Sequence, residues 1–404
     1  MAKRAGTLLI GQSGGGTAVI NGSLAGAVVT AQQMGVGRIL GMRHGIEGVL
    51  REEFIDLSHL EAPTIQALRR TPSGALGLCR YKMTEDDETR ALETLRRWDV
   101  RWLLYIGGND SAETAARLSR KALQNNYELA IISIPKTIDN DLPITDHTPG
   151  YGTAARFVSS ATRFLDADAR AMRSVDRVRV LEVYGRDTGW LAAASALAKD
   201  RADAAPHIIL PPEIPFRVEH FLGAVTNVVR RCDYAVVVVG EMLRDATGAL
   251  VGSVQGRSKD AFGNEESRRP GDYIEDLIER ELGMPAKDDR PGSLHKVAAW
   301  SYSHVDADEA FAVGEAGVKA ALAGHTAMMV TIVRDSRPGP YASSTGLTDV
   351  GSIVRAVKPL PPHYFDADTY AVTDQFLTYA RPLIGDPLPE LACFDTYPLV
   401  GPTR

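Results

Sequence analysis

The segment AIISIPKTIDND, residues 130–141, carries the clearest fold signal in the chain. It begins with an apolar, β-branched run that is typical of a buried strand, and a proline ends that run. The polar side chains of Lys136, Thr137, Asp139 and Asp141 follow at once. A site for phosphoryl transfer needs a base near the attacking hydroxyl, a metal ligand and cations for the charged oxygens. Because this loop combines those residue types at the end of a predicted strand, we interpret it as part of such a site.

Two earlier glycine-rich turns follow predicted strands in the same way. GQSGGG (residues 11–16) comes after a strand at 7–10, and GGNDS (107–111) comes after a strand at 102–106. Glycines let backbone N–H groups approach a phosphate, and the N-terminus of a following helix adds a favourable dipole. The first turn does not match a Walker motif and fits a tight strand-to-helix connection equally well. The second turn has an alternative interpretation, in which the aspartate or the serine is the N-cap of the next helix.

The rest of the chain continues this alternation of strands and helices. Further strands are predicted over 178–183, 208–210, 235–239 and 328–332, and helices over 20–33, 112–123 and 306–322. Residues 244–293 are polar and rich in glycine and proline, so we expect a solvated excursion with one short helix at 273–282. Strands that alternate with helices favour parallel sheets covered on both faces. A chain of 404 residues suits two domains of ordinary size.

The composition excludes several classes of protein. Hydrophobic residues make up 44% of the chain and charged residues 24%, as in ordinary globular proteins. No apolar run approaches the ~20 residues that span a bilayer, and the N-terminus does not resemble a signal peptide, so we expect a cytoplasmic protein with no membrane partner. A net charge of -6 gives no general reason to bind nucleic acid. The three isolated cysteines are expected to be structural thiols in a reducing compartment.

PKTIDND, together with GGNDS, resembles the phosphofructokinase family, and the resemblance covers most of the chain. Further motifs follow in the family's order: RHGIEG (43–48), TPSGALGLCRYK (71–82), EVYGRDTGW (182–190), VVVVGE (236–241) and VDADEAFAVGEAGVKAAL (305–322). The closing segment YAVTDQFLTYARPLIGDPLPE (370–390) resembles the pyrophosphate-dependent branch. One short motif can arise by chance, but a set in the right order is a specific signal.

The resemblance implies an α/β fold with two doubly wound, mostly parallel-sheet domains and an active site in the cleft between them. Residues 1–150 with roughly 294–360 would form the phosphoryl-donor domain, and residues 151–293 with roughly 361–404 the sugar-phosphate domain. The implied reaction is a magnesium-dependent, reversible transfer of a phosphoryl group from pyrophosphate to the 1-hydroxyl of fructose 6-phosphate. The family also implies a homodimer or homotetramer.

The same motifs carry the family's functional residues onto this chain. Asp139 matches the catalytic base, and Lys136 and Thr137 lie beside it at the reacting group. The resemblance assigns donor binding to Gly15, Arg80, Gly108, Asp110, Ser111 and Lys136, metal binding to Asn109 and Asp141, and sugar-phosphate binding to Thr137, Asp139, Arg177, Tyr184, Gly185, Arg186, Glu241 and Lys296. Arg177 resembles an arginine that often reaches the sugar 6-phosphate across a subunit boundary.

Two positions favour pyrophosphate over ATP as the donor. Members that use ATP have a glycine where this chain has Asp110, whose carboxylate takes up space and repels the α-phosphate of a nucleotide. Those members also have a glycine where Lys136 supplies a cation suited to pyrophosphate. Like charges at close range can cost several kcal/mol, so the pair acts against ATP as well as for pyrophosphate.

Three positions depart from the family's usual pattern. Asn109 replaces an aspartate, Tyr184 replaces a methionine, and Lys296 stands where a Gln-Arg pair is typical. The amide of Asn109 keeps an oxygen ligand but lacks the negative charge of an aspartate. Lys296 keeps a positive charge but lacks the bidentate fork of arginine. These departures leave two alternatives open: the same chemistry on sedoheptulose 7-phosphate, or a catalytically weak regulatory paralogue that binds sugar phosphate.

Overall fold

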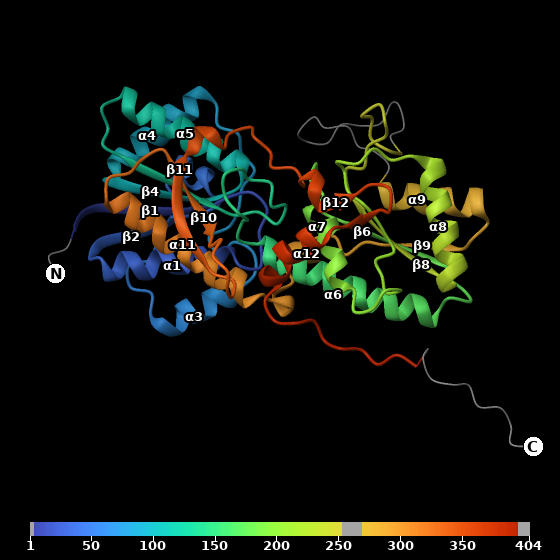
Figure 1. Ribbon diagram of the computed structural model, residues 1–404. Coiled ribbons are helices and arrows are strands. Elements are labelled where there is room, and N and C mark those ends of the chain that lie inside the picture. Colours follow the sequence, from blue (N-terminus) through green and yellow to red (C-terminus); the bar gives the residue numbers. More distant parts are fainter. Residues whose placement is uncertain (1–3, 253–268, 395–404) are drawn as a thin grey trace, which may run out of the picture.

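A seven-stranded sheet forms the core of the lobe that contains the N-terminus in the computed structural model, which describes residues 4–252 and 269–394 (Figure 1). We call this part the larger lobe. The strand order is β11-β10-β5-β4-β1-β2-β3, and the edge strands β3 and β11 run antiparallel to their neighbours. The bounds are β1 Arg4–Gln12, β2 Val36–Met42, β3 Phe54–Asp56, β4 Val100–Gly107, β5 Ala130–Pro135, β10 Met328–Arg334 and β11 Ser343–Asp349.

Helices cover both faces of this sheet because successive side chains of a strand point to opposite faces. Leu8 and Ile10 of β1 pack with α1, α3 and α11 on one face, whereas Leu9 packs with α2, α4 and α5 on the other. The bounds are α1 Ile20–Gln33, α2 Ile46–Arg51, α3 Ala62–Arg70, α4 Glu85–Arg97, α5 Asn109–Gln124 and α11 His304–Leu322.

A four-stranded parallel sheet in the order β7-β8-β6-β9 forms the smaller lobe. Val178 and Val180 of β6 pack with α8 and α9, whereas Leu181 and Val183 pack with α6, α7 and α12. The bounds are β6 Val178–Val183, β7 Ile208–Leu210, β8 Ala235–Gly240, β9 Ala286–Asp289, α6 Tyr151–Ala171, α7 Trp190–Ala194, α8 Val218–Cys232, α9 Pro270–Leu282 and α12 Asp374–Ala380.

The chain passes between the lobes several times, so distant parts of the sequence meet where the lobes join (Figure 1). After β9 it runs through α10 (Leu294–Val297) and returns to the larger lobe with α11. After β11 it crosses again to the smaller lobe, where the short strands β12 (Phe365–Asp366) and β13 (Ala371–Val372) pair before α12.

The predicted fold class is confirmed, because mostly parallel strands covered by helices build both sheets. Each predicted strand is present, and the helix predicted over 20–33 coincides with α1. Two details are corrected. Residues 109–111, expected to be a turn, form the first turn of α5, because Gly108 takes the extended N-cap conformation. The stretch 244–293 also contains β9, an edge strand that pairs with β6 through its backbone; residues 253–268 lie outside the described residues.

Two expectations from composition concern the whole chain. Within residues 4–252 and 269–394, no helix combines the length and the apolar character that crossing a bilayer requires. Cys79, Cys232 and Cys393 form no disulfide with one another, as their isolated spacing predicts.

Candidate active site

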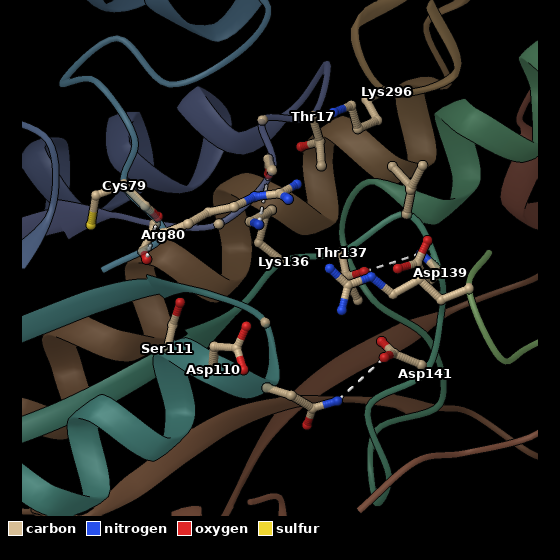
Figure 2. Close-up of a pocket in the computed structure, with 18 of the residues that line it drawn as sticks. Thr17, Cys79, Arg80, Asp110, Ser111, Lys136, Thr137, Asp139, Asp141 and Lys296 are labelled. Atoms are coloured by element: carbon tan, nitrogen blue, oxygen red, sulfur yellow. Dashed lines mark hydrogen bonds between the residues drawn. The ribbon is translucent and has the colours of Figure 1, made fainter. Parts of the chain in front are cut away.

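A pocket of about 540 Å³ lies between the lobes, at the carboxyl ends of β1, β4, β5, β6 and β8 (Figure 2). This is the edge at which open α/β sheets bind ligands. Most of the residues assigned from the sequence line it: Gly15, Arg80, Gly108, Asn109, Asp110, Ser111, Lys136, Thr137, Asp139, Asp141, Tyr184, Arg186, Glu241 and Lys296. The fold therefore brings together side chains that are far apart in the sequence.

The loop after β5 carries the reactive groups of the pocket. Lys136 is only 3% exposed, and its Nζ donates a hydrogen bond of 2.7 Å to a carbonyl of the glycine-rich turn after β1. The backbone N–H of Asp139 donates to Thr137 Oγ1 at 3.1 Å. Asn140 is fully buried and has φ of 55°, a left-handed conformation that asparagine adopts more readily than most residues. With Asn140 buried in this turn, Asp139 and Asp141 on either side of it both line the pocket.

Burial shifts the pKa values of the lysine and of the carboxyl groups in this loop in opposite directions. It lowers the pKa of Lys136 to about 8, although the neighbouring Asp139 and Asp141 oppose that shift. Burial raises the pKa of Asp139 to about 7, and the charges of Asp141 and Glu241 add to the rise. Burial also raises the pKa of Asp141. A carboxylate with a pKa near neutrality suits a general base, since it can accept and return a proton near the working pH.

Asn109 and Asp141 offer oxygen atoms for a divalent cation. Asn109 Nδ2 donates to Asp141 Oδ2 at 3.2 Å, whereas Asn109 Oδ1 is buried without a hydrogen-bond partner. Buried polar atoms are normally satisfied, so this oxygen is available to a ligand. Amide and carboxylate oxygens are the donors that Mg²⁺ takes from proteins. The residues present therefore fit the metal that the resemblance implies.

A second group of carboxylates lies away from the pocket. Among the described residues, Asp272, Glu275 and Asp288 place their oxygens within 4.8 Å of one another. Arg290 pairs with Asp272 and with Asp288, each at 2.6 Å. Because an arginine already pairs with two of the three carboxylates and none of them lines the pocket, we do not assign the metal to this group.

The turns after β1 and β4 form the side of the pocket assigned to the donor. Gly14 has φ of +76°, and a Cβ at this position would lie 3.1 Å from Lys136 Nζ, so glycine leaves room for the ammonium. Burial is the largest cause of the lowered pKa of Lys136, and the positive charge of Arg80 lowers this pKa further. Figure 2 shows Arg80 and Lys136 facing the same space as Asp110 and Ser111. Positive charges and backbone groups thus meet at one end of the pocket.

The smaller lobe supplies the opposite wall. Glu241 Oε1 accepts hydrogen bonds from the backbone N–H groups of Gly185 at 3.3 Å and Arg186 at 2.9 Å. Gly185 does not line the pocket itself, but its φ of +146° shapes the turn, where a Cβ would lie 2.5 Å from the carbonyl of Thr188. The turn therefore needs glycine and fixes the carboxylate of Glu241 beside the pocket.

Tyr184 and Lys296 pack together at the same wall. Lys296 Nζ lies 5.7 Å from the centre of the Tyr184 ring, and His295 stacks on that ring at 5.0 Å. Burial lowers the pKa of Lys296 and lowers the pKa of His295 to about 4, which leaves the imidazole neutral. The tyrosine thus supports the lysine, so that two of the departures from the family pattern form one contact.

Comparison with known proteins decides the family. The family described as Phosphofructokinase matches residues 7–319. The chain belongs to the phosphofructokinase family. It is 40% identical over 385 residues to the pyrophosphate–fructose 6-phosphate 1-phosphotransferase of Xanthomonas campestris pv. campestris, covering 94% of this chain and 91% of that one. The protein of the same name from Methylococcus capsulatus is 40% identical over 390 residues, covering 94% and 92%.

A solved structure extends this likeness to the fold. The crystal structure of the pyrophosphate-dependent phosphofructokinase from Nitrosospira multiformis matches with a TM-score of 0.86 and 34% identity, and covers 99% of each chain. The correspondence includes both lobes, because nearly the whole of each chain is aligned.

Arg177, which the phosphofructokinase resemblance assigned to the sugar, lies away from the pocket. Arg177 is exposed and directly precedes β6, whereas Tyr184 and Arg186 follow the other end of that strand. A strand of six residues is about 20 Å long at 3.3 Å per residue. Arg177 therefore does not reach this pocket from within its own chain, and its role across a subunit boundary stays a prediction.

Several further residues line the pocket without having been assigned a role from the sequence: Ser13, Gly14, Gly16, Thr17, Cys79, Tyr81, Lys82, Thr114 and Ile138. Thr17, labelled in Figure 2, has a buried Oγ1 without a hydrogen-bond partner. Its place directly after the glycine-rich turn is the signal that identifies it. Lys82 lies two residues beyond Arg80 in the same segment, and both line the pocket.

Proposed function

We propose that this protein catalyses the reversible transfer of a phosphoryl group from pyrophosphate to the 1-hydroxyl of fructose 6-phosphate, giving fructose 1,6-bisphosphate and phosphate. Its relatives at 40% identity bear the corresponding name. The observation in this chain that carries the proposal is the buried ammonium of Lys136, which is held between the turn after β1 and the loop that carries Asp139. A cation at this point suits a small donor with a high charge density.

Asp139 is the base in this proposal. In the forward direction the sugar 1-hydroxyl gives its proton to the Asp139 carboxylate, and the sugar oxygen forms a bond to one phosphorus of pyrophosphate. The bond between that phosphorus and the bridging oxygen breaks, and phosphate leaves. Lys136 and Arg80 stabilise the negative charge of the transferring group. In the reverse direction Asp139 returns the proton, which its pKa of about 7 supports.

Members of the family are generally dependent on a divalent metal, and we propose Mg²⁺ here. Asn109 and Asp141 would hold the ion, and the buried Asn109 Oδ1 without a hydrogen-bond partner supports this assignment. When bound, the ion supplies positive charge to the phosphate oxygens. Thr137 also lines the pocket, and in this proposal its hydroxyl contacts the reacting group.

Donor selection rests on charge and room. Gly15, Gly108 and Ser111 present backbone and hydroxyl donors to pyrophosphate. Asp110 lines the same part of the pocket, where its carboxylate repels the α-phosphate of a nucleotide. The ammonium of Lys136 attracts pyrophosphate, the smaller donor. Asp110 and Lys136 therefore both favour pyrophosphate over ATP.

The acceptor side completes the assignment. Tyr184, Gly185, Arg186, Glu241 and Lys296 position the sugar phosphate, with the Glu241 carboxylate available to its hydroxyls. Residues 1–150 with about 294–360 form the donor domain, and 151–293 with about 361–404 the sugar domain. We further propose a cytoplasmic homodimer or homotetramer, in which Arg177 of one subunit reaches the sugar 6-phosphate bound by another. The names of the relatives give fructose 6-phosphate as acceptor, which does not favour sedoheptulose 7-phosphate.

The test is a coupled assay of fructose 1,6-bisphosphate formation by the purified chain. Pyrophosphate and ATP are compared at equal concentration with Mg²⁺, and EDTA serves as the metal-free control. We expect turnover with pyrophosphate that EDTA abolishes, and little with ATP. Turnover with ATP alone would refute the donor assignment, and fructose 6-phosphate binding without turnover would favour the regulatory alternative.

A further inference from the structure

Lys358 lies on the segment that crosses from β11 to the smaller lobe, and its ammonium is fully engaged. Lys358 Nζ donates to Asn140 Oδ1 at 3.2 Å, to the carbonyl of Thr145 at 3.2 Å and to the carbonyl of Asp146 at 2.9 Å. An ammonium has three N–H donors, so all of them are used. The backbone N–H of Lys358 donates a further bond of 2.7 Å to the carbonyl of Asp141. One residue therefore holds the loop after β5 at four points.

Asn140 is the centre of this arrangement. It lies between Asp139 and Asp141, is fully buried and has a left-handed backbone. Lys358 binds the oxygen of its side-chain amide, and its Nδ2 donates to Tyr379 Oη at 3.0 Å. Both ends of the amide are thus held, and a backbone conformation that few residues adopt is stabilised from outside the loop.

The hydroxyl of Tyr379 closes the same network. It accepts the bond from Asn140 and donates one of 2.9 Å to the carbonyl of Asp146. Tyr379 belongs to α12 of the smaller lobe and is 9% exposed. A helix near the end of the chain therefore contacts a loop of the larger lobe.

The segment around Lys358 is also bonded to the smaller lobe. The carbonyl of Lys358 accepts from Trp190 Nε1 at 3.0 Å, and Lys358 Nζ lies 5.1 Å from the centre of the Trp190 ring. Two residues on, the N–H of Leu360 donates to Glu213 Oε1 at 2.7 Å, an oxygen that also accepts from Gly189 at 2.9 Å. We call residues 358–360 the strap. They form hydrogen bonds to the loop after β5 in the larger lobe, and to Trp190 of α7 and Glu213 in the smaller lobe.

We propose that Lys358 and Tyr379 are positioning residues that act through Asn140 to hold the carboxylates of Asp139 and Asp141 in their reactive places. This inference rests on the proposed function for its kinetic meaning. Neither residue lines the pocket, so neither is expected to touch a substrate. Misplacing a reacting group by about 1 Å can lower a rate about 100-fold without removing a binding contact. The proposal therefore predicts a loss in kcat that leaves KM nearly unchanged.

The test uses two variants of the full chain and a matched control. Lys358→Met keeps most of the side-chain volume but removes the ammonium, and we expect kcat to fall about 10- to 100-fold with KM for both substrates changed less than about threefold. Tyr379→Phe removes one hydroxyl, is the milder change, and should lower kcat about 3- to 10-fold. Tyr234→Phe is the control: its hydroxyl donates a buried bond of 2.7 Å to Asp166 in the smaller lobe, and its kcat should equal that of the parent protein.

Hydrogen exchange of residues 137–147 provides a readout that needs no activity. Both positioning variants should exchange faster in this loop while the remainder of the larger lobe is unchanged, and Tyr234→Phe should not. Kinetics within twofold of the parent, with unchanged exchange in the loop, would overturn the proposal. Equal losses of kcat in all three variants would also overturn it, since that pattern reports general destabilisation. If the parent protein shows no turnover, the proposed function fails, but the exchange result still decides whether the strap orders the loop.

Discussion

His147 provides a sharp test of the electrostatics on the far side of the reactive loop. It is 1% exposed, and its ring nitrogens lie 2.8 Å from Asp146 Oδ2 and 2.6 Å from Glu309 Oε2. Burial works against its charge, but the hydrogen bonds and charges of the two carboxylates raise the pKa of His147 from 6.5 to about 9. At neutral pH the residue is therefore an imidazolium that donates to both partners. The perturbation is His147→Asn, which removes the titrating group.

The expected magnitude follows from proton linkage. Below pH 6.5 the histidine is charged in both the folded and the unfolded chain, so its ion pairs contribute fully to the free energy of unfolding. Between pH 6.5 and about 9 the unfolded chain loses this proton while the folded protein keeps it, so stability falls as the pH rises. At 1.36 kcal/mol per pH unit the whole change is about 3 kcal/mol. The stability difference between the parent protein and His147→Asn should therefore be largest at pH 6 and about 3 kcal/mol smaller at pH 10.

Urea unfolding of the full chain, followed by pulse proteolysis at several pH values, measures this difference. His207→Asn is the matched control. Burial lowers the pKa of His207 to about 4, so it is neutral above pH 7 in both states, and the effect of its substitution should not change between pH 7 and pH 10. A destabilisation by His147→Asn that is equally independent of pH would show that His147 is not charged in the folded protein, and would refute the reasoning.

The remaining predictions concern the pocket. Asp139→Asn should lower kcat about 100-fold or more, as loss of a general base does, with little change in fructose 6-phosphate binding by calorimetry; an active variant would remove Asp139 from the role of base. Asp110→Gly combined with Lys136→Gly should raise turnover with ATP relative to pyrophosphate, and an unchanged ratio of kcat/KM would contradict our account of donor choice. Asn109→Asp adds a second charge at the metal position, so the Mg²⁺ concentration at half-maximal rate should fall about 3- to 10-fold. An unchanged requirement in that titration would place the metal elsewhere.

The sequence predicts most of what depends on local pattern. The strand that ends at Pro135 and the loop that follows it are recognisable, because an apolar run and a cluster of chemically unlike polar residues lie next to each other. The same holds for the glycine-rich turns after β1 and β4. Since carboxyl ends of parallel strands share one edge of a sheet, the meeting of Lys136 with Gly15 follows from the fold class alone. The family resemblance then supplies the side chains of the smaller lobe, such as Glu241.

What the sequence does not predict depends on contacts between distant elements. Lys358 lies in a segment rich in proline and without periodicity, so nothing local marks it as a ligand of Asn140. Tyr379 appears in the sequence as one aromatic residue among several near the end of the chain, and its hydroxyl gains meaning only when α12 contacts the larger lobe. β9 is missed for a related reason: an edge strand needs backbone partners more than an apolar pattern, and its sequence, AKDD, is mostly polar.

The reactive loop combines groups that destabilise it with groups that hold it. Burial raises the pKa of Asp139 and of Asp141, so folding works against their ionised forms at neutral pH. Five residues further on, Asp146 and its carbonyl are bound by three cationic side chains, those of His147, Arg334 and Lys358. The charge pairs that stabilise the folded loop therefore lie around Asp146, whereas the carboxylates required for the reaction, Asp139 and Asp141, lie nearer its start. One of the cations comes from the strap, which also bonds to the smaller lobe. Our proposal therefore links the order of the reactive loop to the contact between the two lobes that enclose the pocket.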